Sequence, residues 1–383
     1  MARALVPATF ADYRELSRRR LPRQLFDYID GGSYQEVTLR DNAGDLDRLR
    51  IRQRVLHDVS RLDLSTSVLG ERWAMPVAFA PVGLAGLMRR RGEVQAARAA
   101  EAAGVPFSLS TVGLCSIEEV AQASRTPFWF QLYMMRDRGF VAELIARARQ
   151  ARCSALMLTV DLAYTGARYR DVRSGLAGGL AFRGRLAVAL DRMRRIGWVR
   201  DVALGGRPLV FGTIASRLPN ARSLPEFVDF VQANFDPSVT WKDVEWVRTQ
   251  WGGPLVIKGV LEPEDAKMAA DAGAQAIVVS NHGGRQLDSV PSTIVALPAI
   301  ADAVGDRLDV IFDGGVRSGL DVVKAVALGA KGCLIGRAWV YALAALGEAG
   351  VTRMLQTIRK EIEVAMALAG VTSVSAIDRT LLV

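Results

Sequence analysis

The sequence contains few cysteines and histidines and no long apolar run, and these absences exclude several classes of protein. Three cysteines and two histidines among 383 residues are too few for a disulfide framework or a Cys/His zinc site. No run approaches the roughly 18 apolar residues that a transmembrane helix needs, and the first residues lack the apolar core of a secretory signal. We therefore expect a reduced, cytoplasmic protein without a metal or a membrane span.

Apolar and basic residues are abundant instead. Half of the residues are hydrophobic, so a large core can be buried and general disorder is not expected. Lys and Arg exceed Asp and Glu by 49 − 40 = 9. A positive balance suits anionic substrates, phosphate-bearing cofactors, nucleic acid or an acidic membrane surface, and it does not choose among them.

Short apolar runs recur from residue 76 onward and alternate with segments of helical periodicity. Eight runs occur, at residues 77–80, 107–110, 128–131, 155–160, 255–258, 277–280, 310–313 and 333–336. Alternating strands and helices indicate a parallel sheet, and eight such units predict a closed (β/α)8 TIM barrel. A doubly wound open sheet shares the alternation. The barrel is favoured because polar residues follow several runs, as at the C-terminal face of a barrel.

The predicted barrel has two additions within what we expect to be a single domain of residues 1–383. Residues 1–75 form an N-terminal helical extension, and residues 76–370 form the barrel. The fourth and fifth strands are separated by far more residues than a barrel loop needs. We interpret residues 171–239 as an insertion over the active face.

An arginine-rich helix is predicted within this insertion, at residues 185–197. At about 100° per residue, Leu186, Leu190 and Met193 share one face, and several arginines lie off it. Such a helix suits an anionic membrane surface, whereas a lid or an oligomer contact is the alternative. The segment 180–200 is therefore a candidate for peripheral membrane contact.

The most distinctive stretch is Ser280–Asp288, which reads Ser-Asn-His-Gly-Gly-Arg-Gln-Leu-Asp and directly follows a buried run. His282 precedes two glycines, and Arg285 follows three residues later. A histidine and a cation on a glycine turn at a strand end predict a catalytic turn, in which we interpret Asp288 as a structural anchor. His57, in the N-terminal extension, has no candidate partners and is interpreted as structural.

Two turns that pair glycine with arginine predict a phosphate site. They are Asp313-Gly314-Gly315-Val316-Arg317 and Gly336-Arg337, after the seventh and eighth runs. Glycines let backbone N–H groups approach a phosphate, arginines add charge, and loops at these positions commonly bind phosphate in this fold. Two ordinary turns with solvated arginines are the alternative. Without a GxGxxG or Walker motif, a mononucleotide such as FMN fits better than NAD or ATP.

Further candidates stand at other strand ends, each with a structural alternative. Lys258 is the last residue of an apolar strand. Its ammonium either stabilises the negative charge of a reduced flavin ring or extends to solvent at the barrel rim. Asp161 suits the carboxylate that orients a base histidine, or a helix N-cap. Arg168 suits a carboxylate substrate or a surface salt bridge, with Arg170 as a competitor. Tyr133 is either a site residue or barrel packing.

These motifs together resemble those of the FMN-dependent 2-hydroxy-acid dehydrogenases and oxidases. The resemblance extends from Phe26–Gly32 to a C-terminal helix near Met366. The segments that carry the resemblance are 280–288, 129–133, 166–171 and 234–238. The resemblance implies an FMN-dependent oxidation of an L-2-hydroxy acid, with L-lactate to pyruvate as the expected reaction. It also implies a quinone or similar acceptor and a homotetramer. An oxidase that uses O2 and releases H2O2 is the alternative.

The resemblance implies a role for each matched residue. The residues implied for catalysis are His282 as the base, Asp161 and Tyr133; those for substrate binding are Tyr28, Arg168, Arg285 and Tyr133. Those implied for FMN binding are Val82, Gly83, Ser110, Gln131, Thr159, Lys258, Ser280, Asp313, Gly314, Gly315, Arg317, Gly336 and Arg337.

Two positions depart from the oxidases of that family, and two other classes of protein are disfavoured. Val112 stands where plant glycolate oxidase has a tryptophan, and Gly83 stands where oxidases often have alanine. The glycine favours a dehydrogenase. A non-redox FMN barrel, such as an isomerase, would leave the His282 and Arg285 arrangement unexplained. A nucleic-acid scaffold is disfavoured because the arginines are not interleaved with aromatic residues.

Overall fold

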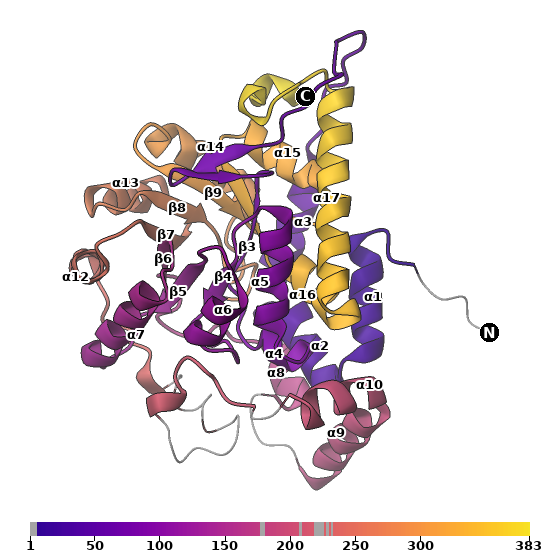
Figure 1. Cartoon of the computed structure of the whole chain (residues 1–383), viewed down its shortest axis with the longest axis vertical. Coiled ribbons are helices and arrows are strands. Elements are labelled where there is room, and N and C mark those ends of the chain that lie inside the picture. Colours follow the sequence, from indigo (N-terminus) through magenta and orange to yellow (C-terminus); the bar gives the residue numbers. More distant parts are fainter. Residues whose placement is uncertain (1–5, 177–180, 207–208, 218–225, 227–229, 231–232) are drawn as a thin grey trace.

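Eight parallel strands form a nearly closed barrel in the computed structural model, which confirms the predicted fold (Figure 1). The structure describes residues 6–176, 181–206, 209–217, 226, 230 and 233–383. The strands follow the order β3-β10-β9-β8-β7-β6-β5-β4, and a parallel bridge from Phe79 to Phe107 joins the two ends. Their bounds are Val77–Phe79 (β3), Ser108–Ser110 (β4), Trp129–Tyr133 (β5), Ala155–Thr159 (β6), Leu255–Val260 (β7), Ala276–Val279 (β8), Asp309–Asp313 (β9) and Gly332–Ile335 (β10).

Helices surround this barrel (Figure 1). Those between and after the strands are α4 (Ala85–Met88), α5 (Gly92–Ala103), α6 (Ile117–Ala123), α7 (Arg138–Gln150), α12 (Trp241–Trp251), α13 (Pro263–Asp271), α14 (Thr293–Val304), α15 (Gly319–Ala327), α16 (Arg337–Leu346) and α17 (Glu348–Leu368). The N-terminal extension contributes α1 (Phe10–Arg20), α2 (Arg23–Asp30) and α3 (Val37–Arg48). Helix α1 starts at a capping box of Thr9 and Asp12.

The strands alternate between two cores with the period of two expected for a sheet. The first core lies inside the barrel and includes Trp129, Met157, Val256, Val278 and Ile311. The second, outside, packs the intervening residues against the helices. Two positions beyond each of those five interior residues stands a polar one, namely Gln131, Thr159, Lys258, Ser280 and Asp313. The alternation therefore directs polar side chains to the C-terminal mouth of the barrel.

A small hairpin covers the opposite end of the barrel, and the sequence did not predict it. Short strands are expected near Ile51 and Leu62, but the hairpin pairs β1 (Thr66–Val68) with β2 (Glu71–Trp73). Leu62 forms no strand, and Ile51 makes one isolated bridge, to Leu382. The ring centroid of Trp73 lies 5.7 Å from that of Trp129 inside the barrel. The burial of Trp73 against the barrel interior holds β1 and β2 in place, although each strand is only three residues long.

The insertion after β6 begins with α8 (Tyr169–Ser174) and α9 (Phe182–Arg194), followed by α10 (Ile196–Trp198), a π-helical turn at Val199–Leu204 and a 3-10 turn at Ala215–Arg217. The predicted helix at 185–197 is therefore displaced toward the N-terminus and interrupted at Arg195, whose ψ is 58°. Short 3-10 turns at Val374–Ala376 and Arg379–Leu381 end the chain.

Candidate active site

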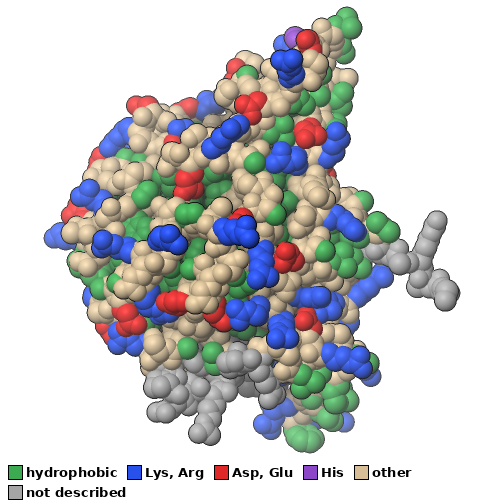
Figure 2. Space-filling view, in the orientation of Figure 1, with side chains coloured by type: hydrophobic (Ala, Val, Ile, Leu, Met, Phe, Trp, Pro, Cys, Tyr) green, Lys and Arg blue, Asp and Glu red, His purple; other side chains and the backbone are tan. Residues whose placement is uncertain are grey.

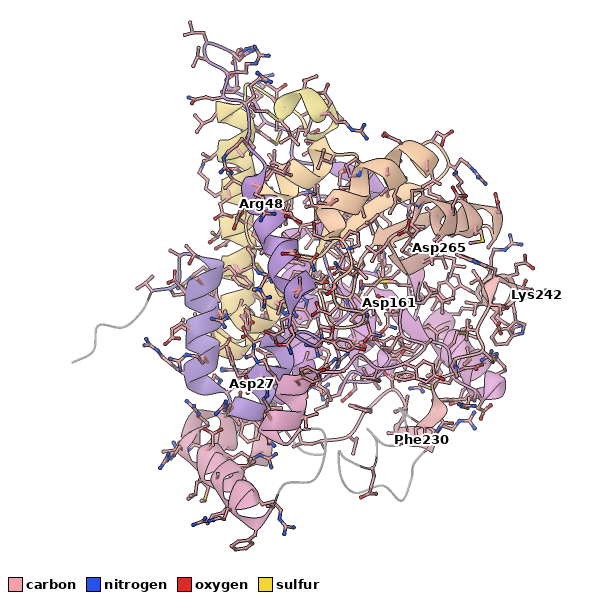
Figure 3. All side chains as sticks on the ribbon, turned by 180° about the vertical axis from the view of Figure 1, so that it is seen from behind. Asp27, Arg48, Asp161, Phe230, Lys242 and Asp265 are labelled. Atoms are coloured by element: carbon pink, nitrogen blue, oxygen red, sulfur yellow. The ribbon has the colours of Figure 1, made fainter. Side chains whose placement is uncertain are left out.

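A cavity of about 930 Å³ lies at the C-terminal ends of the strands, near the upper end of the ~300–1,000 Å³ usual for small-ligand sites. The predicted residues that line it are Tyr28, Val82, Gly83, Tyr133, Thr159, Arg168, Lys258, His282, Arg285, Asp313, Gly314, Gly315, Arg317, Gly336 and Arg337. The remaining four, Ser110, Gln131, Asp161 and Ser280, are absent from this lining and contact one another or residues that line it. Figure 3 labels Asp161 among the side chains in the middle of the molecule, and its side chain is 13% exposed.

The histidine of the catalytic turn faces a carboxylate from a neighbouring strand. His282 Nδ1 lies 2.9 Å from Asp161 Oδ1, which leaves the other ring nitrogen for the cavity. His282, Gly283 and Gly284 have φ values of 57°, 64° and 71°. A Cβ on Gly284 would lie 2.6 Å from the backbone nitrogen of Leu39 in α3. Glycine at that position therefore lets α3 approach the turn.

Burial and the charge of the partner shift the pKa values of His282 and Asp161 in opposite directions. Burial lowers the pKa of His282 below its ordinary value of 6.5, and Asp161 only partly offsets this effect. Burial alone would raise the pKa of Asp161, but His282 and Lys258 outweigh it and hold that pKa below 3.8. At neutral pH the pair is thus a neutral imidazole beside a carboxylate. This combination suits a general base whose protonated form is stabilised as it appears.

Two arginines reach the cavity beside the imidazole without an acidic partner. Neither Arg168 nor Arg285 has a carboxylate within 4.0 Å in the part of the chain that the structure describes. Burial, and then the nearby Arg285, lower the pKa of Arg168 to about 10, so both guanidiniums are charged at neutral pH. Paired cations without a counter-ion form an anion site, and their planar groups suit a carboxylate.

The backbone of α2 holds the second of these arginines. Arg285 Nη1 donates to the carbonyl oxygens of Tyr28 and Gly31, at 2.5 and 2.9 Å. The guanidinium carbon lies 4.8 Å from the centroid of the Tyr28 ring. Across the cavity, burial and then Asp161 raise the pKa of Tyr133, so its phenol stays a neutral hydrogen-bond donor. The N-terminal extension is therefore part of the site.

Lys258 does not occupy the barrel rim but belongs to a buried network of three strand ends. Its Nζ donates to Ser280 Oγ at 2.9 Å and lies 3.1 Å from Asp313 Oδ2. Ser280 Oγ in turn donates to Asp313 at 2.7 Å and accepts from the N–H of His282 at 3.1 Å. Asp313 compensates the buried ammonium, and Ser280 links it to the catalytic turn.

The glycine–arginine turns after β9 and β10 form the far end of the cavity. Gly314 and Gly315 have φ values of 121° and 85°, where a side chain would be strained. Burial, then Arg285 and Arg317, lower the pKa of Arg337 to about 9. Arg317 and Arg337 also lack a carboxylate within 4.0 Å among the described residues. This end therefore offers bare backbone and two cations to an anion.

Two features of the site were not predicted from the sequence. Gln286 donates from Nε2 to the carbonyl oxygens of Asp161 and Tyr164, at 2.8 and 2.9 Å, and ties the catalytic turn to the loop after β6. The carbonyl of Gly31 also accepts from Arg337, at 2.8 Å, so one end of α2 orients arginines at both ends of the cavity. The only sequence feature that could have indicated a role for Gln286 in the site is its position within the motif Ser280–Asp288. Arg170 does not compete with Arg168, because it pairs with Asp27 and Asp30.

Asp288 anchors the catalytic turn to the start of α3, as the sequence predicts. Its carboxylate accepts from the backbone N–H groups of Gln35, Val37 and Thr38, at 3.1, 3.2 and 2.8 Å. We expect Asp288→Ala to lower the free energy of unfolding by about 1–2 kcal/mol, because helix-start N–H groups lose their acceptor. Urea unfolding measures this change. Asp302→Ala, which breaks only an exposed ion pair, is the control and should cost less; equal losses would contradict the anchoring role.

Comparison with known proteins gives full-length matches. The profile of the FMN-dependent dehydrogenase family matches residues 17–383. The chain is 58% identical over 378 residues to the L-lactate dehydrogenase of Caulobacter vibrioides (strain NA1000 / CB15N), covering 99% of this chain and 98% of that protein. It is 52% identical over 379 residues to the L-lactate dehydrogenase of Ectopseudomonas mendocina (strain ymp), covering 99% of both.

Solved structures agree with the fold. A crystal structure of the monotopic membrane protein (S)-mandelate dehydrogenase superposes with a TM-score of 0.93 at 34% identity, over 99% of this chain and 100% of that one. A crystal structure of mandelate oxidase superposes with a TM-score of 0.83 at 37% identity, over 99% and 98% of the two chains.

Proposed function

The chain belongs to the FMN-dependent dehydrogenase family, and from that premise we propose that it oxidises L-lactate to pyruvate and passes the electrons to a quinone. The observation that carries the substrate class is the pair Arg168 and Arg285, which lack an acidic partner among the described residues and line one cavity with His282. A short 2-hydroxy acid supplies the missing carboxylate and places a hydroxyl beside the base. The names of the close relatives support lactate.

The cavity fits FMN at both ends. Gln131 Nε2 and Thr159 Oγ1 are buried without a hydrogen-bond partner in the described part of the chain, as expected of groups that meet the polar edge of a ring. Gly315, Arg317 and Arg337 supply backbone and charge for a phosphate. The residues proposed to hold FMN are Val82, Gly83, Ser110, Gln131, Thr159, Lys258, Ser280, Asp313, Gly314, Gly315, Arg317, Gly336 and Arg337. When bound, FMN accepts the two electrons that leave the substrate.

The side chains around the substrate divide the remaining work. Arg168 and Arg285 bind its carboxylate and fix its orientation, which removes rotational freedom before reaction. Tyr28 and Tyr133 donate hydrogen bonds to it. His282 takes a proton on the ring nitrogen that faces away from Asp161, and the carboxylate of Asp161 stabilises the resulting imidazolium. Lys258 would offset the negative charge that FMN gains on reduction.

The proposed base sets the pH dependence. Because burial depresses the pKa of His282 below 6.5, the neutral form dominates at pH 7. The value of kcat/KM should therefore fall on the acid side, with its midpoint below pH 6.5. In Asp161→Asn the midpoint should move to still lower pH, since the carboxylate that favours protonation is gone. Profiles of kcat/KM against pH test this, and an acid midpoint above pH 7 in the wild type would contradict it.

An oxidase that reduces O2 to H2O2 is the alternative, and Gly83 bears on it. A Cβ there would lie 2.6 Å from Val112 Cγ2, so glycine lets Val112 pack closely against this wall of the cavity. Steady-state assays with L-lactate, D-lactate, glycolate and mandelate test the proposal, using a soluble benzoquinone or O2 as the acceptor. We expect L-lactate with the quinone to give the highest kcat/KM and little peroxide. Preference for another acid, or stoichiometric peroxide, would overturn that part of the proposal.

Helix α9 supports peripheral contact with the cytoplasmic face of an anionic membrane. Phe182, Leu186, Leu190 and Met193 are exposed, and no residue of α9 is buried. Figure 2 shows hydrophobic and basic side chains together at this end of the molecule. The opposite side of the helix is occupied, since Asp191 accepts from the N–H of Arg23 in α2 at 2.7 Å. No helix within the described ranges is long and apolar enough to cross a membrane.

We expect the double variant Leu186→Glu/Met193→Glu to lose membrane binding. Two apolar anchors are replaced by charges that anionic lipid repels, so partition into vesicles containing phosphatidylglycerol should fall more than tenfold. Flotation of the purified protein measures this. The matched control is Val295→Glu/Val364→Glu, at exposed apolar positions on α14 and α17, which should float like the wild type. Equal flotation of both variants would contradict membrane docking through α9.

The family resemblance also supports a homotetramer. Sedimentation equilibrium of the purified protein tests this assignment, and a monomeric mass would overturn it.

A further inference from the structure

We propose that the apolar arm of the cavity binds the ring of a lipid-soluble quinone, the oxidising substrate. We define this arm by Leu25, Leu87, Leu176, Trp198, Leu209 and Phe211. The proposal rests on the proposed function, because it assigns a place to the electron acceptor of that reaction. It adds a second substrate site, built from α2, α4 and the insertion, which includes α10.

The chemistry of the arm differs from that of the rest of the cavity. The hydroxy-acid end carries His282, Arg168 and Arg285, and the phosphate end carries Arg317 and Arg337. The six residues of the arm are all apolar or aromatic. A small anionic acid has no group that such walls would bind, and a charged, water-soluble acceptor would lose hydration there without compensation.

The polar groups beside the arm are already paired with protein. Gln24 donates to the carbonyl of Ser174 at 2.8 Å and accepts from Arg192 at 2.6 Å. The indole N–H of Trp198 donates to the carbonyl of Leu87 at 2.7 Å. The apolar surfaces of the arm suit a flat, weakly polar ring, which gains mainly from burial.

The arm reaches the surface beside the proposed membrane-docking helix. Val172, which also lines the cavity, is 58% exposed. Trp198 in the arm lies two residues after the exposed Ile196 and five after Met193 of α9. A quinone could therefore keep its isoprenoid tail in the lipid while its ring enters the arm. A lipid-soluble acceptor is the occupant that satisfies both the apolar walls and this location.

The redox balance is complete with this second substrate. The hydroxy acid loses two electrons and two protons, one proton from its hydroxyl and one from its α-carbon, and becomes the 2-oxo acid. The quinone gains two electrons and two protons and becomes the hydroquinone. No further oxidant or reductant is needed, and each turnover returns the enzyme to its starting oxidation state.

Binding to the oxidised holoenzyme tests the site without turnover. Titration calorimetry in mild detergent gives the Kd of decyl-benzoquinone. Leu209→Asp puts a carboxylate into a half-buried wall position and should raise this Kd at least tenfold, whereas the volume-matched Leu209→Met should stay within twofold. Irradiation with a photoreactive azidoquinone should label peptides that contain residues 85–88 or 196–211.

The reductive half-reaction separates this site from the proposed function. Anaerobic bleaching of the flavin by L-lactate should keep its wild-type rate in Leu209→Asp, because none of the six residues of the arm is among those proposed to bind the acid. If Leu209→Asp loses its flavin, Val172→Trp, which narrows the exposed mouth without burying a charge, replaces it and should show the same tenfold loss. Unchanged quinone affinity in the variant, or labelling confined to other peptides, overturns the site. Failure of the wild type to bleach overturns the proposed function instead.

Discussion

Replacing His282 by glutamine is expected to lower kcat by roughly three to four orders of magnitude, the upper part of the range for loss of a general base. Glutamine keeps a polar side chain of similar reach but cannot accept the proton. The side chain of His282 contacts Asp161, and the backbone hydrogen bond from His282 N–H to Ser280 survives the change. The variant should therefore stay folded and keep its flavin spectrum. Anaerobic stopped-flow reduction by L-lactate measures the loss.

The second histidine provides the control for this experiment. His57 is exposed and lies against Gly370, remote in sequence from the catalytic turn. His57→Gln should reduce the flavin at the wild-type rate, and Asp161→Asn should fall between the two histidine variants. A His282→Gln enzyme within tenfold of the wild type would show that another group takes the proton.

Replacing Arg285 by methionine is expected to lower kcat/KM for L-lactate by about 10³. Removing one partner of a buried charge-assisted contact costs ~3–5 kcal/mol, and each 1.4 kcal/mol corresponds to about tenfold. The loss should appear in both KM and kcat, because the same guanidinium binds the carboxylate and orients the α-carbon. Steady-state kinetics over a wide range of lactate concentration, with the flavin content measured in each preparation, tests this.

Two further variants show whether charge or structure is responsible. Arg285→Lys should recover only part of the rate, since an ammonium cannot reproduce the two-pronged guanidinium. Arg173→Met removes an exposed arginine that stacks on Tyr169 and should be close to wild type. Normal KM and kcat in Arg285→Met would show that Arg285 does not bind the substrate carboxylate.

The barrel and the polar ring at its mouth were predictable because both follow from local periodicity. Strands such as Leu255–Val260 are apolar enough to be recognised from the sequence. The period of two then places Lys258 on the same inward face of the strand as Val256. The residues implied by the family resemblance, Tyr28 included, were likewise within reach of the sequence, and most of them line one cavity.

Other features depend on contacts between distant segments, which no local pattern encodes. The backbone carbonyl of Gly31 holds Arg285 and Arg337, and a carbonyl has no sequence signature. The β1–β2 hairpin depends on burial of Trp73 under the barrel, and its strands are too short to show a period. The outward apolar face of α9 was visible as a pattern, but its side facing α2 depends on bonds such as that of Asp191 to Arg23.

Anaerobic addition of L-lactate to the purified oxidised protein, followed by its visible spectrum, tests whether a bound FMN takes electrons from L-lactate. We expect flavin absorption bands that bleach on mixing, with one pyruvate formed for each bound FMN, and no bleaching with D-lactate. A protein purified without flavin bands that also fails to bind added FMN would contradict the account. So would a flavin that L-lactate leaves oxidised.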